Sequence, residues 1–376
     1  MYLDHAATTP MRPEVAAAMA PLASEIFGNS SGIHEVSRRA KNALEEARER
    51  AAAVLGARPI EIVFTSGGTE ADNLALKGAV FNPSPRRGVV TVATEHEAIL
   101  EAADFLKRVG MPTTVVGVDG EGRVAPDRLA GAVTGDTAVV SVMMVNNETG
   151  TVQPVAEVAE AVKEADPEVL VHTDAVQGFN CIDIDAGSLG VDLLSLSGHK
   201  FGGPKGSGLL YVRDGTKLEP VQHGGGQELG RRSGTHDVAS AVGLATAMEL
   251  AADDRARFRD EIGSKRDRFH DLVLDRIGDV ASNTPEQGRS WHHLNLRFPG
   301  VSNQILLMRL DQAGVCASAG SACQSGAATV SHVLEAMGLG PDEARECVRF
   351  TFGWTSTDEE AELGAKTVVE LVGELR

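Results

Sequence analysis

The sequence predicts an α/β fold with a mainly parallel sheet, because short apolar runs alternate with helix-like segments through the first two-thirds of the chain. These runs are nearly continuous in apolar residues, which is typical of strands that are covered on both faces. The chain has 376 residues, of which 42% are hydrophobic and 23% charged, so its length favours two domains with ample core material.

Apolar or β-branched runs predict the strands of the first domain, and they span residues 60–64, 89–93, 113–118, 138–145, 169–173, 193–196 and 209–212. Helical patterns lie between several of them. In residues 34–55 the apolar side chains recur at helical spacing and stop at Gly56. Another helical segment opens with Pro154 at a plausible first helical position.

The sequence pattern changes after the glycine cluster at 224–226, and the change predicts an α+β second domain. Its expected elements are helices within 237–277, a strand at 293–298, a helix at 303–313, a loop of small residues at 318–328, a strand at 348–352 and a final helix. The boundary falls near 245–255. We assign residues 12–250 to the large domain, and residues 1–11 and 251–376 to the small one.

The charge balance excludes several kinds of partner. Lys and Arg total 35 against 53 Asp and Glu, a net charge of −18, which argues against direct binding of nucleic acid or of an anionic membrane. We expect no signal peptide, because the segment MYLDHAATTP has an acid at position 4 and no apolar core, and no apolar run approaches the roughly 20 residues of a membrane span. Four cysteines without C-x-x-C spacing predict neither a disulfide framework nor a zinc site. A cytoplasmic protein without a bound metal is expected.

Polar residues that could take part in binding or catalysis follow the predicted strands. The segment TSGGTE at 65–70 enters a helix and is either a phosphate cradle containing Gly68 and Thr69 or an ordinary turn. His96 follows the second strand, as a catalyst or as a satisfied hydrogen-bonding residue. Asp174, with Gln177 after it, follows the strand at 169–173 and alone fits a helix cap equally well.

Lys200, in SGHK after the strand at 193–196, is the fourth such residue. It is either a solvated lysine or an amine of lowered pKa that forms a Schiff base. Because ligands of open α/β sheets bind beyond the carboxyl ends of the strands, these four positions are expected to meet. A phosphate cradle, an aromatic ring, a carboxylate and an amine together match the needs of pyridoxal phosphate.

Cys323 differs from the other cysteines because it lies in the small, polar stretch SAGSACQSGAA, which would leave its thiol accessible. A nucleophilic role and an ordinary surface cysteine are both compatible with that composition. Cys181, Cys316 and Cys347 are interpreted as structural.

The sequence resembles the cysteine desulfurases of the pyridoxal-phosphate-dependent class V aminotransferase family, of the iron–sulfur-cluster-assembly and nitrogen-fixation type. The motifs that carry the resemblance are YLDHAATTP, GNSSGIH, FTSGGTEADN, TEHEA, VNNETGTVQP, HTDAVQ, SLSGHKFGGPKG, GGGQELGRRSGT, GSACQS and RFTFGWTS, spread over nearly the whole chain. The resemblance implies the type I pyridoxal-phosphate fold, with a mainly parallel seven-stranded sheet, and a homodimer whose active sites lie at the subunit interface.

It also implies roles for residues of the cofactor site. Lys200 would bind the cofactor aldehyde and move the substrate Cα proton. His96 would stack on the ring and handle protons at the substrate as a further catalytic residue. Asp174 would pair with the pyridinium nitrogen, and Gln177 with the ring oxygen. The phosphate would be held by Gly68, Thr69, Ser197, His199 and Thr235 of the partner subunit.

The implied reaction converts L-cysteine into L-alanine and leaves a persulfide on Cys323, whose loop carries the sulfur to an acceptor protein such as an iron–sulfur scaffold. Asn147 and Arg349 would bind the substrate carboxylate, with which an arginine can form a bidentate pair of hydrogen bonds. Thiolation of tRNA, phosphorothioation of DNA and cofactor synthesis remain open as destinations of the sulfur.

Three features depart from the family pattern, namely His5, the GNSSG sequence and Trp354. They bear on the substrate pocket or on docking of an acceptor. A selenocysteine lyase or another enzyme of the same fold, such as a transaminase, is the alternative function. A non-catalytic scaffold is a third possibility, and it predicts loss of Lys200 or Asp174, both of which are present.

Overall fold

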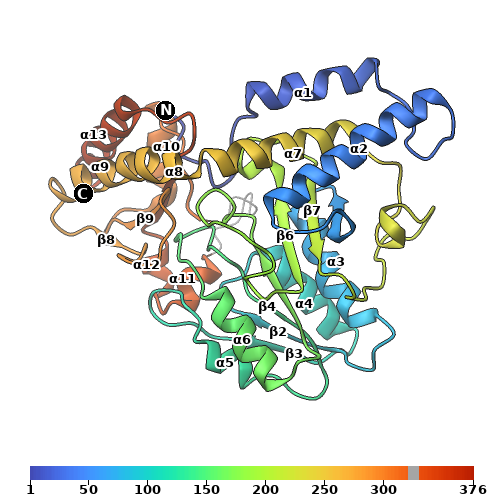
Figure 1. Ribbon diagram of the computed structural model, residues 1–376. Helices are drawn as coiled ribbons and strands as arrows, with labels where there is room; N and C mark the ends of the chain where they lie inside the picture. The colour runs from blue at the N-terminus through green and yellow to red at the C-terminus, as the bar shows by residue number, and fades with distance from the viewer. Residues whose placement is uncertain (321–329) are drawn as a thin grey trace.

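The computed structural model describes residues 1–320 and 330–376. Its larger part is a sheet with helices on both faces, and its smaller part contains a second, three-stranded sheet beside the chain's two termini (Figure 1). The α/β fold class that the sequence predicts is therefore confirmed.

The large sheet has seven strands in the order β1-β7-β6-β5-β4-β2-β3. Their bounds are β1 Ile62–Thr65, β2 Gly88–Val92, β3 Thr113–Val116, β4 Thr137–Ser141, β5 Leu170–Asp174, β6 Leu193–Ser197 and β7 Gly208–Val212. Pairs β6–β5, β5–β4, β4–β2 and β2–β3 are parallel, and β7 runs antiparallel to both β1 and β6. All the predicted strands of this domain form, with shifted ends. The first begins at Ile62 because Pro59–Glu61 form a 3₁₀ turn.

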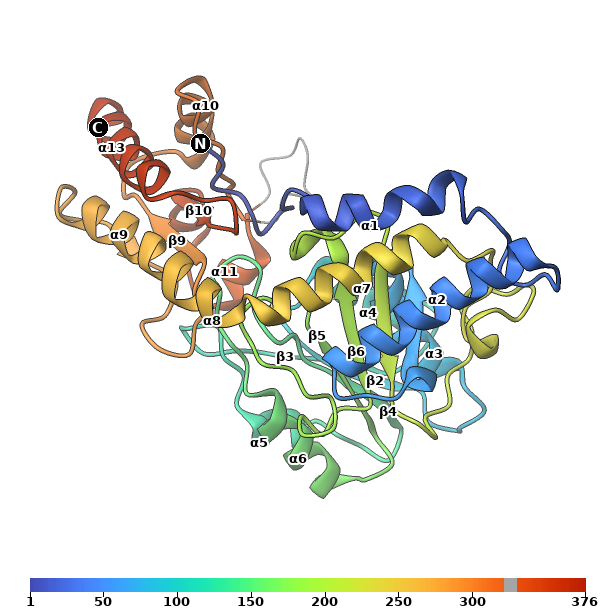
Figure 2. The same cartoon turned by 45° about the horizontal axis from the view of Figure 1, so that its top comes forward.

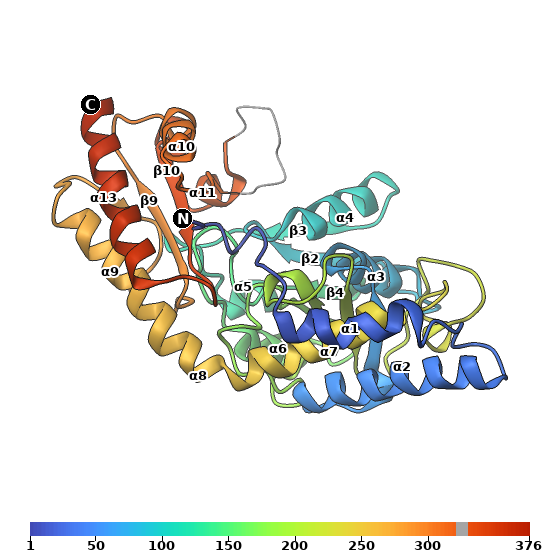
Figure 3. The same cartoon turned by 90° about the horizontal axis from the view of Figure 1, so that it is seen from above.

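Alternate strand residues point to opposite faces of this sheet, and helices bury both faces except at the edge strand β3, where Thr114 and Val115 are exposed. Ile62 and Phe64 belong to one apolar cluster with α2 and α7, whereas Val63 belongs to another with α3 and α4. The helices of this part are α1 Pro13–Ser24, α2 Glu35–Val54, α3 Gly68–Phe81, α4 Glu97–Arg108, α5 Pro126–Ala130, α6 Val155–Ala165 and α7 Val238–Asp253. Viewed from above, α3 and α4 lie on one side of the sheet and α2 and α7 on the other (Figure 3). Pro154 immediately precedes α6 instead of opening it.

The smaller part is built on an antiparallel sheet of order β10-β9-β8. Its elements are α8 Arg255–Arg257, α9 Gly263–Leu274, β8 Ala281–Ser282, β9 His293–Arg297, α10 Asn303–Gln312, α11 His332–Ala336, α12 Pro341–Ala344, β10 Cys347–Thr351 and α13 Asp358–Leu375. Its apolar cluster joins Leu3 to residues between Phe258 and Val372. The N-terminus lies beside α10 (Figure 2), where the Met1 amino group donates to the Gly314 carbonyl at 2.6 Å. The domain bounds themselves stay a prediction.

No helix in the described parts of the chain is both long and apolar enough to pass through a membrane.

A buried ion pair ties α2 to the segment before α7. The Arg48 guanidinium donates to both carboxylate oxygens of Glu228 at 2.7 and 2.9 Å, and the Phe64 amide donates to the same carboxylate at 3.0 Å. Burial would raise the pKa of Glu228, but the hydrogen bonds from Arg48 and His236 outweigh it and lower this pKa to about 2. The backbone of Glu228 has a φ of +50°, so the contact also holds a strained turn.

This pair predicts a pH-dependent stability. Because the folded pKa of Glu228 lies below its unfolded value, the stabilisation is present above about pH 4.3 and is lost as the pH falls toward 2; it amounts to about 3 kcal/mol. We expect the difference in unfolding free energy between wild type and Glu228→Gln to shrink by this amount from about pH 6 to about pH 2. Urea denaturation at several pH values measures it, and a constant difference would contradict the assignment.

Candidate active site

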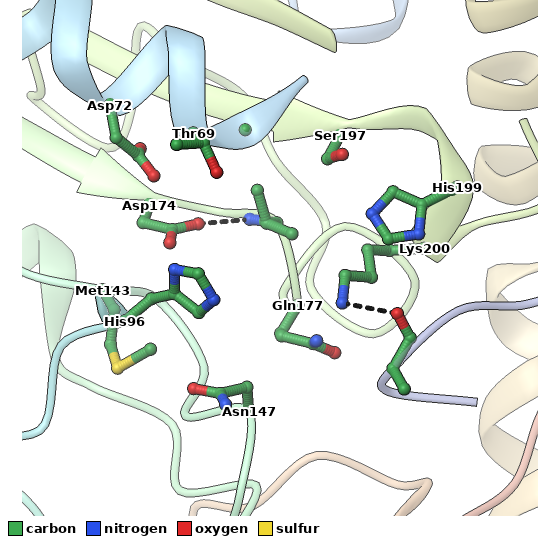
Figure 4. Close-up of a pocket in the computed structure, with 13 residues that line it drawn as sticks. Thr69, Asp72, His96, Met143, Asn147, Asp174, Gln177, Ser197, His199 and Lys200 are labelled. Atoms are coloured by element: carbon green, nitrogen blue, oxygen red, sulfur yellow. Dashed lines mark hydrogen bonds between the residues drawn. The ribbon is translucent and has the colours of Figure 1, made fainter. Parts of the chain in front are cut away.

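One pocket lies beyond the carboxyl ends of β1, β2, β4, β5 and β6, and it has a volume of about 200 Å³ (Figure 4). The predicted residues that line it are Gly68, Thr69, His96, Asn147, Asp174, Gln177, Ser197, His199 and Lys200. The structure therefore brings together residues that are up to 132 positions apart, counted from Gly68 to Lys200. Asp72, Met143, Val176 and Ala7 also line the pocket and were not predicted.

The N-terminus of α3 forms one end of the pocket and suits an anion. The helix begins at Gly68, and no described side chain caps its first turn. Such a helix end offers backbone N–H groups and a positive dipole end. A Cβ atom at Gly68 would lie 2.9 Å from Val176 Cγ2, so a larger residue here would have to displace the Val176 side chain. Thr69 and Ser197 lie along the same side (Figure 4).

Asp174, at the end of β5, is a buried carboxylate in the pocket wall. Its Oδ1 atom accepts the Val176 amide at 2.9 Å. Burial raises the pKa of Asp174, against the opposing influence of His96 and Lys200. Burial also raises the pKa values of Asp72 and Glu95, with Asp174 adding to both. A cationic ligand atom facing Asp174 would relieve the cost of burying these acids.

His96 caps α4 and presents its ring to the pocket. Its Nδ1 atom accepts the Ala98 amide at 3.1 Å. Burial lowers the pKa of His96, which favours the neutral ring with its proton on Nε2. A neutral imidazole at this position can stack on a flat ligand and can exchange a proton through Nε2.

Lys200 lies in the 3₁₀ turn Gly198–Lys200 after β6, with its amine held by the N-terminal segment. The Nζ atom donates to the Ala6 carbonyl at 2.6 Å and to the Ala7 carbonyl at 3.0 Å. Gln177 Nε2 donates to the same Ala6 oxygen at 2.9 Å. Ala7 thus lines the pocket, and the Ala6 and Ala7 carbonyls hold two of its side chains, a function that sequence reasoning missed although it noted the motif YLDHAATTP.

His199 contacts the same segment, since its Nδ1 atom lies 3.1 Å from Thr8 Oγ1. Burial, followed by the nearby Lys200, lowers the pKa of His199 to about 4. The ring is therefore neutral near pH 7 and can donate or accept a hydrogen bond at the pocket edge.

Arg349, in β10, does not line the pocket itself. Its guanidinium donates through Nη2 to Asp4 Oδ1 at 2.7 Å and through Nη1 to the Asn147 carbonyl at 2.8 Å. The side chain is buried, and its Nε atom has no hydrogen-bond partner among the described residues. Arg349 thus supports the backbone of Asn147, a lining residue, and its substrate role stays a prediction.

Thr235 lies apart from the pocket. It lines a different cavity of about 190 Å³ together with Thr65, Ser66, Arg232 and His236. Its assignment to the phosphate of a second subunit stays a prediction.

Cys323 lies outside the described residues. Burial raises the pKa of Cys181 to about 12 and that of Cys347 to about 11, which agrees with structural roles for both thiols. Cys316 is exposed, and its backbone pairs with Tyr2. Although the neighbouring Val315 is buried, the Cys316 thiol is exposed, and its structural assignment stays a prediction.

Two of the departures from the family pattern, His5 and Trp354, lie in or beside the N-terminal segment. His5 is buried, with Nδ1 2.8 Å from Thr9 Oγ1, and burial lowers its pKa to about 4. A Cβ atom at Gly353 would lie 2.1 Å from that ring, so His5 requires a glycine opposite. Trp354 donates from Nε1 to the Pro10 carbonyl at 3.1 Å. Neither His5 nor Trp354 lines the pocket.

Within the described residues, no three side chains of the types that ligate metals are grouped to hold an ion. An uncapped helix end, a neutral imidazole, a buried carboxylate and an amine instead suit a flat heteroaromatic ligand that carries an anionic group.

Comparison with known proteins gives one family over nearly the whole chain. The model of the family "Aminotransferase class-V" matches residues 1–363. The cysteine desulfurase IscS of Dictyoglomus turgidum is 43% identical over 377 aligned positions, which cover 100% of this chain and 95% of that protein.

Solved structures show the same relationship. A NifS-like protein superposes with a TM-score of 0.93 at 35% identity, covering 100% of this chain and 99% of the other. SspA, solved in complex with cysteine, gives a TM-score of 0.83 at 36% identity, covering 93% of this chain and 98% of that one.

Proposed function

The chain belongs to the class V aminotransferase family, and we propose that it is a cysteine desulfurase, which converts L-cysteine into L-alanine and leaves the sulfur on Cys323. Similarity to cysteine desulfurases along the full chain supports the activity. The observation that carries the proposal is the single pocket that unites Lys200, Asp174 and His96.

The described residues fit pyridoxal phosphate. The buried Asp174 carboxylate, whose pKa is raised by burial, suits a protonated ring nitrogen. The uncapped end of α3, with Thr69, Ser197 and His199, suits the phosphate, and Gln177 the ring oxygen. When bound, pyridoxal phosphate supplies an electron sink for the electrons released at the substrate Cα.

The protein's own groups bind the substrate and move its protons. The Lys200 amine removes the Cα proton and returns one, and the carbonyls of Ala6 and Ala7 orient that amine. Asn147 and Arg349 hold the substrate carboxylate, Arg349 acting beside Asn147 and paired with Asp4. A homodimer, in which Thr235 of the partner subunit completes the phosphate site, is part of the proposal.

The sulfur then passes to a second protein, for which an iron–sulfur scaffold is the proposed acceptor. This destination rests on the similarity to IscS proteins. The net charge of −18 favours a protein acceptor over direct contact with nucleic acid. A cytoplasmic location stays a prediction.

The products of L-cysteine test the activity. With pyridoxal phosphate and an excess of a small thiol, we expect alanine and sulfide in equal amounts, because each turnover removes one sulfur atom. A transaminase would instead release a keto acid, and a selenocysteine lyase would act on L-selenocysteine alone. Amino-acid analysis and a sulfide assay on both substrates separate the three outcomes, and either alternative product pattern would contradict the proposal.

A further inference from the structure

Glu148 follows the pocket residue Asn147 and is completely buried. Its Oε2 atom accepts the Ser331 hydroxyl at 2.6 Å, while Oε1 has no hydrogen-bond partner among the described residues. Burial raises the pKa of Glu148, and the opposing influences are Ser331, Arg349 and His332. Burying a carboxyl group that has one oxygen without a hydrogen-bond partner lowers the stability of the fold.

The Glu148 carboxylate also touches Gly320. A Cβ atom at Gly320 would lie 2.5 Å from Oε2, and the φ of +129° is one that side-chain-bearing residues rarely adopt. The backbone at 320 therefore passes directly against the carboxylate, and glycine alone permits this approach. Gly320 and Ser331 stand on either side of Cys323 in the sequence, so both ends of the Cys323-bearing segment meet one side chain.

Further contacts join the same two ends to residues that neighbour the pocket. On one side, Ser318 and Arg349 exchange backbone hydrogen bonds of 3.2 and 2.6 Å. On the other, His332 Nε2 lies 2.9 Å from the carbonyl of Glu95, the residue before His96. The segment thus leaves and returns at residues that adjoin pocket residues, and Glu148 is common to both ends.

We propose that Glu148 is a positioning residue that fixes both ends of the Cys323-bearing segment relative to the pocket. The inference deepens the proposed desulfurase function and rests on it. Sulfur transfer needs the thiol of Cys323 to meet the substrate sulfur, and small errors in placement slow such a step strongly. Glu148 is not among the residues that line the pocket, so within the described residues the contacts of its carboxylate are with the two ends of the segment.

The test compares Glu148→Ala with Glu148→Gln and with Glu335→Ala, an exposed glutamate on α11. We expect Glu148→Ala to lower kcat roughly 100-fold while KM and cofactor content change by less than about twofold. Glu148→Gln keeps an acceptor oxygen for the Ser331 hydroxyl and should recover most of kcat. Glu335→Ala should match wild type.

Ser331→Ala completes a double-mutant cycle. Because Ser331 acts through Glu148, the double variant should be no slower than Glu148→Ala alone. Additive effects would overturn the proposal. So would an unchanged kcat in Glu148→Ala, or a fall in kcat accompanied by loss of cofactor or a large rise in KM.

Hydrogen exchange separates this inference from the proposed function. The backbone amides at Gly320 and Ser331 should exchange about tenfold faster in Glu148→Ala, because a buried hydrogen bond to Glu148 is lost. If the wild type makes no alanine, the desulfurase function is refuted. The exchange measurement would still test whether Glu148 fixes the two ends of the segment. Unchanged exchange would overturn the anchoring role even in an active enzyme.

Discussion

Replacing Lys200 with alanine is expected to abolish alanine formation from L-cysteine, with a loss of at least about 10⁴-fold in kcat. The amine is the group that the proposed function uses both to bind the cofactor aldehyde and to move the Cα proton. Its position follows from β6, which ends at Ser197, and from the two carbonyl oxygens of Ala6 and Ala7 that receive Nζ. A stopped or continuous alanine assay measures the loss.

Lys205→Ala is the matched control, because Lys205 is an exposed lysine only five positions later and does not line the pocket. It should retain wild-type activity. The visible absorption of the Lys200→Ala protein should also change, since the covalent link between lysine and cofactor is missing. Partial recovery of activity by an added small alkylamine would identify the missing group as an amine, and a fully active Lys200→Ala enzyme would refute the assignment.

Much of the pocket could be predicted because its residues follow strands with strong local signals. The apolar runs before His96, Asp174 and Lys200 fixed the sheet, and parallel strands then bring their carboxyl ends to one edge. The glycine-rich segment that contains Gly68 likewise predicted a helix start, and α3 begins at Gly68. These predictions depend only on the local sequence around each residue.

The remaining parts of the site depend on contacts that no local pattern encodes. Ala6 and Ala7 act through backbone carbonyls, which every residue carries, so their side chains give no signal. Asp4 and Arg349 are 345 positions apart, and either alone resembles an ordinary surface charge. Asp72 lies one helical turn inside α3, where an acidic residue is usually solvated rather than buried against a second carboxylate.

Cys323→Ser is expected to stop alanine and sulfide formation while leaving cofactor binding intact, a loss of at least about 10³-fold. The sum of the reaction explains why: L-cysteine and the Cys323 thiol become L-alanine and a persulfide, so no external oxidant is needed. The carbon–sulfur bond breaks, a sulfur–sulfur bond forms, and the electrons of the broken bond end in the new carbon–hydrogen bond of alanine. A serine hydroxyl cannot accept the sulfur in this way.

Cys316→Ser provides the control, because Cys316 is an exposed thiol only seven positions earlier. If Cys323 is the nucleophile, Cys316→Ser keeps full activity, and mass spectrometry after one turnover without added thiol finds one extra sulfur atom on the peptide containing Cys323. A small thiol then removes this sulfur as sulfide. Normal turnover by Cys323→Ser would assign the chemistry to another group, and an extra sulfur on Cys316 instead would place the acceptor at the surface edge beside Tyr2.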